Sequence, residues 1–246
     1  MTFLLIVGSS LAGGVVAVVL AGTVLAVQAS LVERALPRLV SFSTGTLLGA
    51  ALMGMVPHAA EALPVSTVTF VVLAGLILFF VLEKLFVWRH CHNYDCEVHA
   101  SSGPLLLIGD AFHNFVDGVV IAGAFFTSTT LGIATALSTI AHEVPQELGE
   151  YMVYLRSGYT RRRALSMNAA TSLTSVVGAV FGCFFLSKMR TAVPYLMAVA
   201  AAGFLYVALA DLIPAQRGRT TLGLTLLDLL LVVAGIGVIA PVAHGH

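Results

Sequence analysis

Two neighbouring apolar stretches of this 246-residue chain each carry a cluster of side chains that could bind a metal ion. The first cluster contains Asp110, His113, Asn114 and Asp117, and the second contains His142, Glu143, Gln146, Glu147 and Glu150. A carboxylate at the centre of a bilayer costs about 2.5–3.5 kcal/mol on insertion scales. A bound divalent cation would offset this cost, because it converts mutually repelling acids into ligands. Imidazole, carboxylate and amide groups together suit a borderline ion, so Zn²⁺ fits best, with Fe²⁺, Mn²⁺, Co²⁺ and Cd²⁺ as alternatives.

Helical geometry gathers each cluster onto one face. At about 100° per residue, Asp110, His113 and Asp117 fall within roughly 60° of arc, with Asn114 beside them. The second stretch carries a matching stripe made of His142, Gln146 and Glu150, with Glu143 and Glu147 on its flank. The connection at 127–130 is short, and short connections make antiparallel neighbours. The two stripes are therefore predicted to face each other.

Pro145 lies inside the second stretch and has no backbone N–H. The carbonyl of Ala141 therefore loses its helical hydrogen-bond partner. A kink at this point would open the helix beside the polar cluster, as happens in membrane helices that line a site.

The elements that must hold these residues are membrane spans. The chain is 59% hydrophobic and 10% charged, whereas a soluble domain carries about 25% charge. Eight runs reach spanning length, near 3–27, 39–61, 66–88, 104–126, 131–155, 164–187, 192–213 and 221–242. We therefore predict an all-α polytopic membrane protein with eight transmembrane helices in one domain. Zero net charge gives no case for nucleic-acid binding.

Basic residues gather on one side of the predicted spans. Ten of the twelve follow odd-numbered spans or lie at their ends, namely Arg34, Arg38, Lys84, Arg89, Arg156, Arg161, Arg162, Arg163, Arg217 and Arg219. The other side has only Lys188 and Arg190. Because cytoplasmic loops are enriched in Lys and Arg, the basic side is predicted to be cytoplasmic. Both termini are then extracytoplasmic, in a plasma (inner) membrane.

The two clusters resemble the signature of the ZIP (Zrt/Irt-like) metal transporters. HNFVDG at 113–118 is similar to HNxxD in the fourth span of that family, and HEVPQELGE at 142–150 is similar to HExPHExGD in the fifth. Gln146 stands where the pattern usually has His, and Glu150 stands where it has Asp. The resemblance implies metal uptake into the cytoplasm, usually by a homodimer in which spans 1, 4, 5 and 6 move against spans 2, 3, 7 and 8. No organic cofactor is expected, and no G-x-x-x-x-G-K-[ST] loop is present.

The resemblance also implies two adjacent metal positions. The first would use His113, Asp117, His142 and Gln146. The second would use Asn114 and Glu143, with Gln146 as a shared ligand. A residue of the sixth span would complete the second position, and the candidates are Asn168, Thr171 and Ser175.

The segments around 45–57 and 203–214 are similar in sequence and lie in spans two and seven, which run in opposite directions. Inverted repeats flanking a central site are common in transporters, although chance similarity of Gly/Ala/Leu-rich helices is the alternative. In the ZIP family, spans 1–3 and 6–8 are related in this way around spans 4 and 5. The same relation is therefore predicted here.

Accessory roles along the metal path are predicted for a wider set of residues. His58 and Glu61 could collect metal on the outer side, and Asp211 could gate the cytoplasmic side. Asp110, Glu147 and Glu150 could support the site or the exit path. The cytoplasmic loop 89–103 could capture released metal through His90, Cys91, His92, Cys96 and His99.

Two functions from other classes compete with transport. His142-Glu143 begins an H-E-x-x-H pattern, in which Glu is the general base of a zinc protease. Gln146 is a poor zinc ligand at the second histidine position of that pattern, which disfavours an intramembrane metalloprotease. A metal sensor that does not transport is the other alternative. The sequence therefore favours a divalent metal transporter that works within the lipid bilayer and is not an enzyme.

Overall fold

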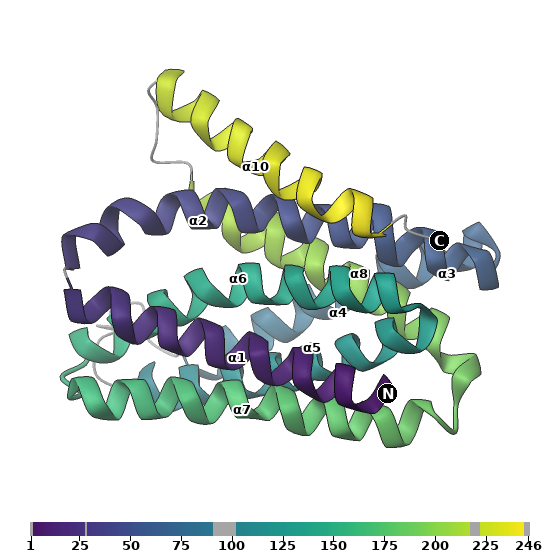
Figure 1. Cartoon of the computed structure of the whole chain (residues 1–246), viewed down its shortest axis with the longest axis horizontal. Helices are drawn as coiled ribbons and strands as arrows, with labels where there is room; N and C mark the ends of the chain where they lie inside the picture. Colours follow the sequence, from purple (N-terminus) through teal and green to yellow (C-terminus); the bar gives the residue numbers. More distant parts are fainter. Residues whose placement is uncertain (1, 28, 91–101, 217–221, 244–246) are drawn as a thin grey trace.

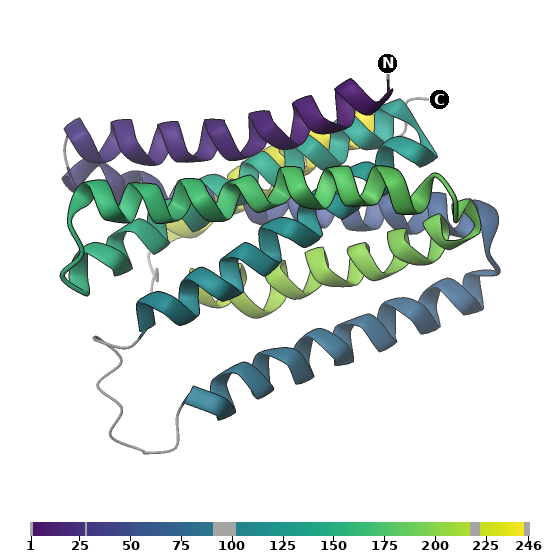
Figure 2. The same ribbon diagram turned by 90° about the horizontal axis from the view of Figure 1, so that it is seen from below.

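A computed structural model of the chain describes residues 2–27, 29–90, 102–216 and 222–243. These residues form helices and no strands. The longer helices are α1 (Thr2–Val27), α2 (Ala29–Gly49), α4 (Val65–His90), α5 (Ser102–Thr127), α6 (Thr129–Arg156), α7 (Arg161–Leu186), α8 (Val193–Tyr206) and α10 (Leu222–Ala243). The shorter segments are η1 (Ala50–Met55), α3 (Val56–Ala62), η2 (Arg190–Ala192), η3 (Val207–Leu212) and α9 (Ile213–Ala215). Most long helices run roughly along one direction, and α10 leans away from the bundle at its first residues (Figures 1 and 2).

The all-helical, polytopic character of the prediction is confirmed. Six helical stretches of the described chain are long and apolar enough to cross a membrane: Thr2–Leu20, Leu36–Ala62, Val65–Leu82, Arg161–Leu186, Arg190–Ala210 and Leu222–Pro241. Helices α5 and α6, which carry the polar clusters, are not among them. Their 26 and 28 residues correspond to about 40 Å of helix, which exceeds the roughly 30 Å of a hydrocarbon core. The count of eight spans stays a prediction.

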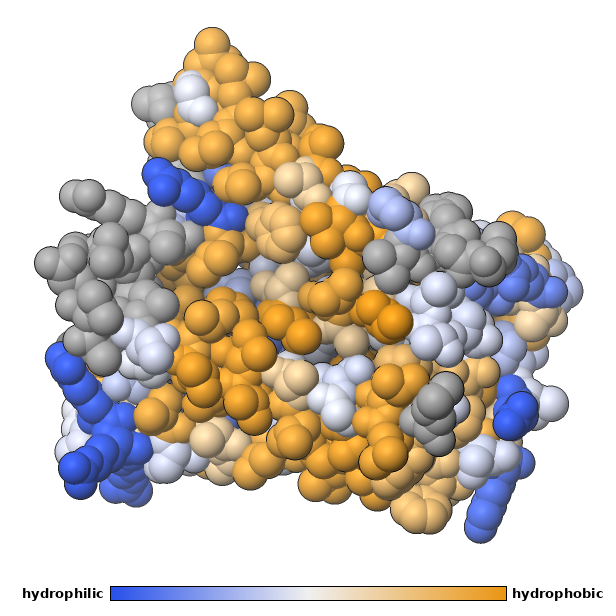
Figure 3. All heavy atoms as spheres, viewed as in Figure 1, coloured by the Kyte–Doolittle hydropathy of each residue, from blue (hydrophilic) through white to orange (hydrophobic). Residues whose placement is uncertain are grey.

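The surface has the polarity of a membrane protein. Apolar side chains dominate the middle of the face in Figure 3, and hydrophilic ones lie toward the two ends of the bundle. The beginning of α1 and the end of α10 lie at the same end of the bundle (Figures 1 and 2), as an even number of crossings requires.

The second and seventh predicted spans share an irregularity. The π-helix η1 lies two residues before Pro57, and the π-helix η3 lies two residues before Pro214. Both segments fall within the pair of similar sequences. The shared feature is what an inverted repeat would produce, but the repeat itself stays a prediction.

Close helix contacts fix the position of α5. A side-chain carbon added to Gly118 of α5 would lie 1.8 Å from the carbonyl oxygen of Ser175 in α7. One added to Gly178 of α7 would lie 1.9 Å from the carbonyl oxygen of Phe115 in α5. Only glycine permits the two backbones to approach this closely. Helices α5 and α7 are therefore bound to each other along much of their length, and α6 contacts both.

Helix α6 begins immediately after α5 and returns beside it. Ser128 is the one residue between the two helices, and its side chain accepts a hydrogen bond from the backbone N–H of Leu131. Such a cap satisfies one of the N–H groups left free at a helix start. The predicted antiparallel neighbours are present.

Pro145 does not interrupt α6, which is continuous from Thr129 to Arg156. The carbonyl of Ala141, which Pro145 deprives of its helical partner, accepts a hydrogen bond from the Ser43 hydroxyl of α2. A second bond joins the same two helices, from the Ser138 hydroxyl to the carbonyl of Thr46. The freed carbonyl is therefore satisfied by the neighbouring helix.

Candidate metal centre

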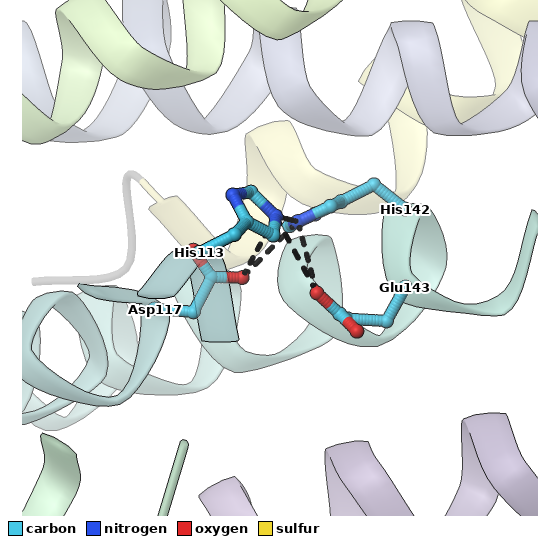
Figure 4. A group of neighbouring side chains, drawn as sticks. All are labelled: His113, Asp117, His142 and Glu143. Atoms are coloured by element: carbon cyan, nitrogen blue, oxygen red, sulfur yellow. Dashed lines mark hydrogen bonds and ion pairs between the residues drawn. The ribbon is translucent and has the colours of Figure 1, made fainter. Parts of the chain in front are cut away.

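Four side chains from α5 and α6 converge in the interior of the bundle (Figure 4). They are His113, Asp117, His142 and Glu143, and each offers one ligand atom within 4.8 Å of the others. Among the described residues, this is the one group of three or more His, Cys, Asp or Glu with ligand atoms so close together. Three of the four are buried, while His113 is 26% exposed at its side chain.

The distances between the ligand atoms fit a bound ion. The Nε2 atom of His142 lies 3.1 Å from Oδ2 of Asp117 and 3.7 Å from Oε1 of Glu143. The Nε2 atom of His113 lies 3.2 Å from that of His142, 3.5 Å from Oε1 of Glu143 and 3.9 Å from Oδ2 of Asp117. Zinc bonds of about 2.0–2.1 Å in a tetrahedron place the ligand atoms roughly 3.3 Å apart. Small side-chain movements would therefore close the group around one zinc ion.

The ring of His142 is held in the orientation that a ligand needs. Its Nδ1 atom lies 2.9 Å from the carbonyl oxygen of Ser138, one turn earlier on α6. A proton on Nδ1 makes this hydrogen bond, and the lone pair of Nε2 then faces the centre. The Phe204 ring of α8 packs edge-on at 5.7 Å between ring centroids. Contacts on two sides therefore fix the imidazole.

The acids of the centre lack other partners. Both carboxylate oxygens of Glu143 are buried without a hydrogen bond. Among the described residues, every ion pair of Asp117 and Glu143 is with one of the two histidines, and none is with Lys or Arg. A buried charge is strongly unfavourable unless it is paired or binds a metal. The chemistry of this donor set, two imidazoles and two carboxylates, favours a divalent cation.

A second polar group lies one helical turn away. The side-chain amide of Gln146 donates to Oδ1 of Asp110 at 3.1 Å and to Oε1 of Glu150 at 3.3 Å. The amide of Asn114 also donates to Oδ1 of Asp110, at 2.9 Å. The structure thus groups Glu143 with the two histidines, and groups Asn114 and Gln146 with Asp110. The division into two metal positions that the sequence resemblance implied stays a prediction.

Helix α7 contacts a third acid. The Ser172 hydroxyl donates to Oε1 of Glu147 at 2.5 Å, and the Asn168 amide donates to the Glu147 carbonyl at 2.8 Å. Thr171 bonds to carbonyls of its own helix, and the hydroxyl of Ser175 lies 3.1 Å from that of Ser10 in α1. The ligand from the sixth span stays a prediction.

A cavity of about 390 Å³ reaches the centre from one side. Its lining consists of Leu36, Val40, His113, His142, Pro145, Gln146, Val207 and Leu212. These residues belong to α2, α5, α6 and η3, so the histidines are accessible from between the helices rather than enclosed.

Comparison with known proteins adds independent information. The family model described as ZIP zinc transporter matches residues 88–243. This chain belongs to the ZIP zinc transporter family. That family comprises transporters rather than enzymes, which argues against the intramembrane protease alternative.

Individual relatives of this ZIP protein carry the same description. "Zinc transporter YKE4" of Saccharomyces cerevisiae is 30% identical over 208 residues, which are 72% of this chain and 60% of that protein. "Zinc transporter foi" of Drosophila melanogaster is 33% identical over 140 residues, 56% of this chain and 20% of that protein. Human "Zinc transporter ZIP4" is 39% identical over 112 residues, which are 46% of this chain and 17% of that protein. The match spans less than two thirds of each of these relatives.

Two other predicted residues of this ZIP protein do not line the cavity at the centre. His58 and Glu61 line a separate cavity of about 250 Å³ together with Arg190, and Nδ1 of His58 lies 2.9 Å from the carbonyl of Gly54. Asp211 is described only as a member of η3. Four predicted loop ligands, Cys91, His92, Cys96 and His99, lie outside the described residues, and His90 is described only as the last residue of α4.

Two supporting residues were not anticipated. Ser43 and Ser138 hold α2 against α6 on either side of Ala141 and His142. The proline pattern indicated that the Ala141 carbonyl would need a partner, but it could not say which residue supplies one. That choice depends on how α2 and α6 are aligned, which the two helix sequences do not specify by themselves.

Proposed function

We propose that this protein carries divalent metal ions, above all zinc, across a membrane through the centre formed by His113, Asp117, His142 and Glu143. The observation that carries the proposal is the convergence of these four ligand atoms within 4.8 Å, in the interior of an apolar helical bundle. Family membership and the zinc transporters among its relatives support zinc as the main ion. Fe²⁺, Mn²⁺, Co²⁺ and Cd²⁺ are secondary candidates, because the same nitrogen and oxygen ligands also suit them.

The direction we propose is uptake into the cytoplasm. The cavity at the histidines is lined by Leu36 and Val40 of α2, near the end of that helix that carries Arg34 and Arg38. Basic residues mark the cytoplasmic side of a membrane. The centre would then open toward the cytoplasm in this conformation, with both termini outside and the protein in a plasma membrane.

We propose that transport uses an elevator-type movement, in which one group of helices slides against another within each subunit of a homodimer. Helices α1, α5, α6 and α7 pack mutually, as do α2 with α10 and α4 with α8. The metal centre lies wholly on α5 and α6. A movement of the first group against the second would carry the ion without rebuilding its ligands. The α2–α6 contact, which includes the Ser43 and Ser138 hydrogen bonds, would be part of the sliding interface.

Metal uptake by proteoliposomes tests the proposal. We expect wild-type protein to take up ⁶⁵Zn²⁺ down its gradient, and His113→Ala, Asp117→Ala and His142→Ala each to abolish most uptake. The loss follows from removing one of four ligands to a borderline ion. Ser166→Ala serves as a control for folding and reconstitution, because the exposed Ser166 hydroxyl bonds only within its own helix.

Near wild-type uptake by all three variants would contradict the proposed centre. Zinc binding by the wild type without any uptake would instead support a sensor. Because the comparison uses purified protein, neither result can come from another transporter.

A further inference from the structure

The polar group beside the histidine centre contains two buried acids whose carboxyl oxygens are only partly hydrogen-bonded. Asp110 is 3% exposed and Glu150 is 8% exposed. On each carboxyl group one oxygen accepts from the Gln146 amide, while the other oxygen, Oδ2 or Oε2, is buried without a hydrogen-bond partner. Among the described residues, no ion pair joins either acid to a basic side chain.

The carboxyl groups of Asp110 and Glu150 both contact the side-chain nitrogen of Gln146. Oδ1 of Asp110 and Oε1 of Glu150 lie 3.1 Å and 3.3 Å from the same nitrogen of Gln146, so they cannot be farther apart than 6.4 Å, the sum of these distances. Two carboxylates this close in an apolar interior repel each other strongly. The amide nitrogen offers hydrogen bonds but no net charge to offset the repulsion.

A cation at the histidine centre would not neutralise this pair. One divalent ion there balances Asp117 and Glu143, the two acids within its ligand group. Glu147 bonds to Ser172. The repulsion between Asp110 and Glu150 must then be offset by a proton or by a cation of their own.

We propose a second cation site, built only from oxygen ligands, at Asp110, Gln146 and Glu150. Its ligands would be the two carboxylates and the amide oxygen of Gln146, which reaches the ion when the amide group turns over. Oxygen-only sites of this kind prefer hard divalent cations such as Mg²⁺, Ca²⁺ or Mn²⁺. Without a nitrogen ligand the site has no preference for zinc.

The position of Gln146 gives this site a route of access. The same side chain lines the cavity that reaches His113 and His142. The Asn114 amide donates to the same Oδ1 atom of Asp110 and helps to hold this carboxyl in place. A hard cation could therefore enter by the same opening as the transported metal and remain one turn away from it.

Mn²⁺ titration of the purified full chain, followed by electron paramagnetic resonance of free Mn²⁺, tests the inference. We expect His142→Ala, which disables the histidine centre, to keep a bound Mn²⁺ equivalent. Asp110→Asn and Glu150→Gln, which are near-isosteric and remove one charge each, should weaken that equivalent by about tenfold or more. Both should retain zinc binding at the histidine centre, which also reports correct folding.

Three results would overturn the second site. They are absence of bound Mn²⁺ in the His142→Ala protein, unchanged Mn²⁺ affinity in both acid variants, and loss of Mn²⁺ only when His142 is replaced. Should an acid variant fail to fold, Gln146→Leu is the substitute, because leucine fills similar space without an oxygen ligand. Transport plays no part in these measurements, so a failure of the second site is distinguishable from a failure of zinc uptake.

Discussion

Gln146 stands where the ZIP sequence pattern usually carries a histidine, and the structure explains how the chain accommodates the difference. The side chain lines the cavity beside His113 and His142, and its amide group bonds to Asp110 and Glu150. Glu143 lies with the two histidines and Asp117 in the group whose ligand atoms are within 4.8 Å of one another. A neutral amide therefore stands beside the centre where a nitrogen ligand would otherwise be.

Replacing Gln146 by histidine should tighten zinc binding. Imidazole nitrogen is a stronger ligand than an amide oxygen for a borderline ion, and we expect an affinity gain of about tenfold, or roughly 1.4 kcal/mol. Turnover in the uptake assay should fall, because a carrier must release what it binds. Calorimetric zinc titration of purified protein measures the first effect.

Gln146→Leu is the matched control for this variant. It removes the amide without adding a ligand, so zinc affinity should not rise. An unchanged affinity in Gln146→His would mean that the new ring does not reach the ion, and that position 146 lies outside the zinc site in solution.

The types and spacing of the clustered residues allowed part of this arrangement to be predicted. Asp110, His113 and Asp117 share one face of α5 because they are separated by three and four residues. The grouping of Glu143 with the histidines was not foreseen. It lies about 100° around the helix from His142, so its place depends on how far α6 is rotated toward α5, and this rotation is set by packing against α2 and α7.

Helix α6 shows how one element depends on its neighbour. Pro145 removes a backbone donor one turn after Ala141, and the Ser43 hydroxyl of α2 supplies a replacement. The Ser138 carbonyl binds His142, and the Ser138 hydroxyl binds α2 at Thr46. The contact that compensates for the proline therefore also supports the metal ligand.

Ser43→Ala should lower stability by about 1–2 kcal/mol, because it leaves the Ala141 carbonyl unsatisfied in an apolar interior. In a Pro145→Ala background the backbone N–H of residue 145 restores the helical bond, so the same substitution should cost much less. Thermal unfolding of the two single variants and the double variant in detergent gives the coupling energy. Ser166→Ala serves as a control, because the exposed Ser166 hydroxyl bonds to Arg163 of its own helix.

Equal destabilisation by Ser43→Ala in both backgrounds would mean that the hydroxyl does not replace the lost bond. The Ser43 contact would then be ordinary packing between α2 and α6.

The existence of the helices was predictable, while their irregularities were not. The boundaries of α5 and α6 follow the apolar runs closely. The π-helical segments η1 and η3 interrupt the second and seventh predicted spans, each two residues before a proline. A proline indicates where a helix can deviate, but the form of the deviation depends on the neighbouring helices.

The molecule as a whole follows from the distribution of its polar groups. The acids of α5 and α6 are buried and many apolar side chains are exposed. On the face in Figure 3, hydrophilic side chains lie toward the two ends. Hydropathy and basic-residue counts predicted this distribution. The association of α1, α5, α6 and α7 required the structure, because contacts between distant helices such as α5 and α7 depend on small residues whose partners a single sequence does not identify.

The most direct test of the metal centre is anomalous X-ray diffraction at the zinc absorption edge from crystals of the zinc-loaded protein. We predict a peak about 2.0–2.2 Å from Nε2 of both histidines and from carboxylate oxygens of Asp117 and Glu143, which disappears in His142→Ala. A strong peak confined to another part of the protein, or one at the centre that persists in His142→Ala, would contradict the assignment.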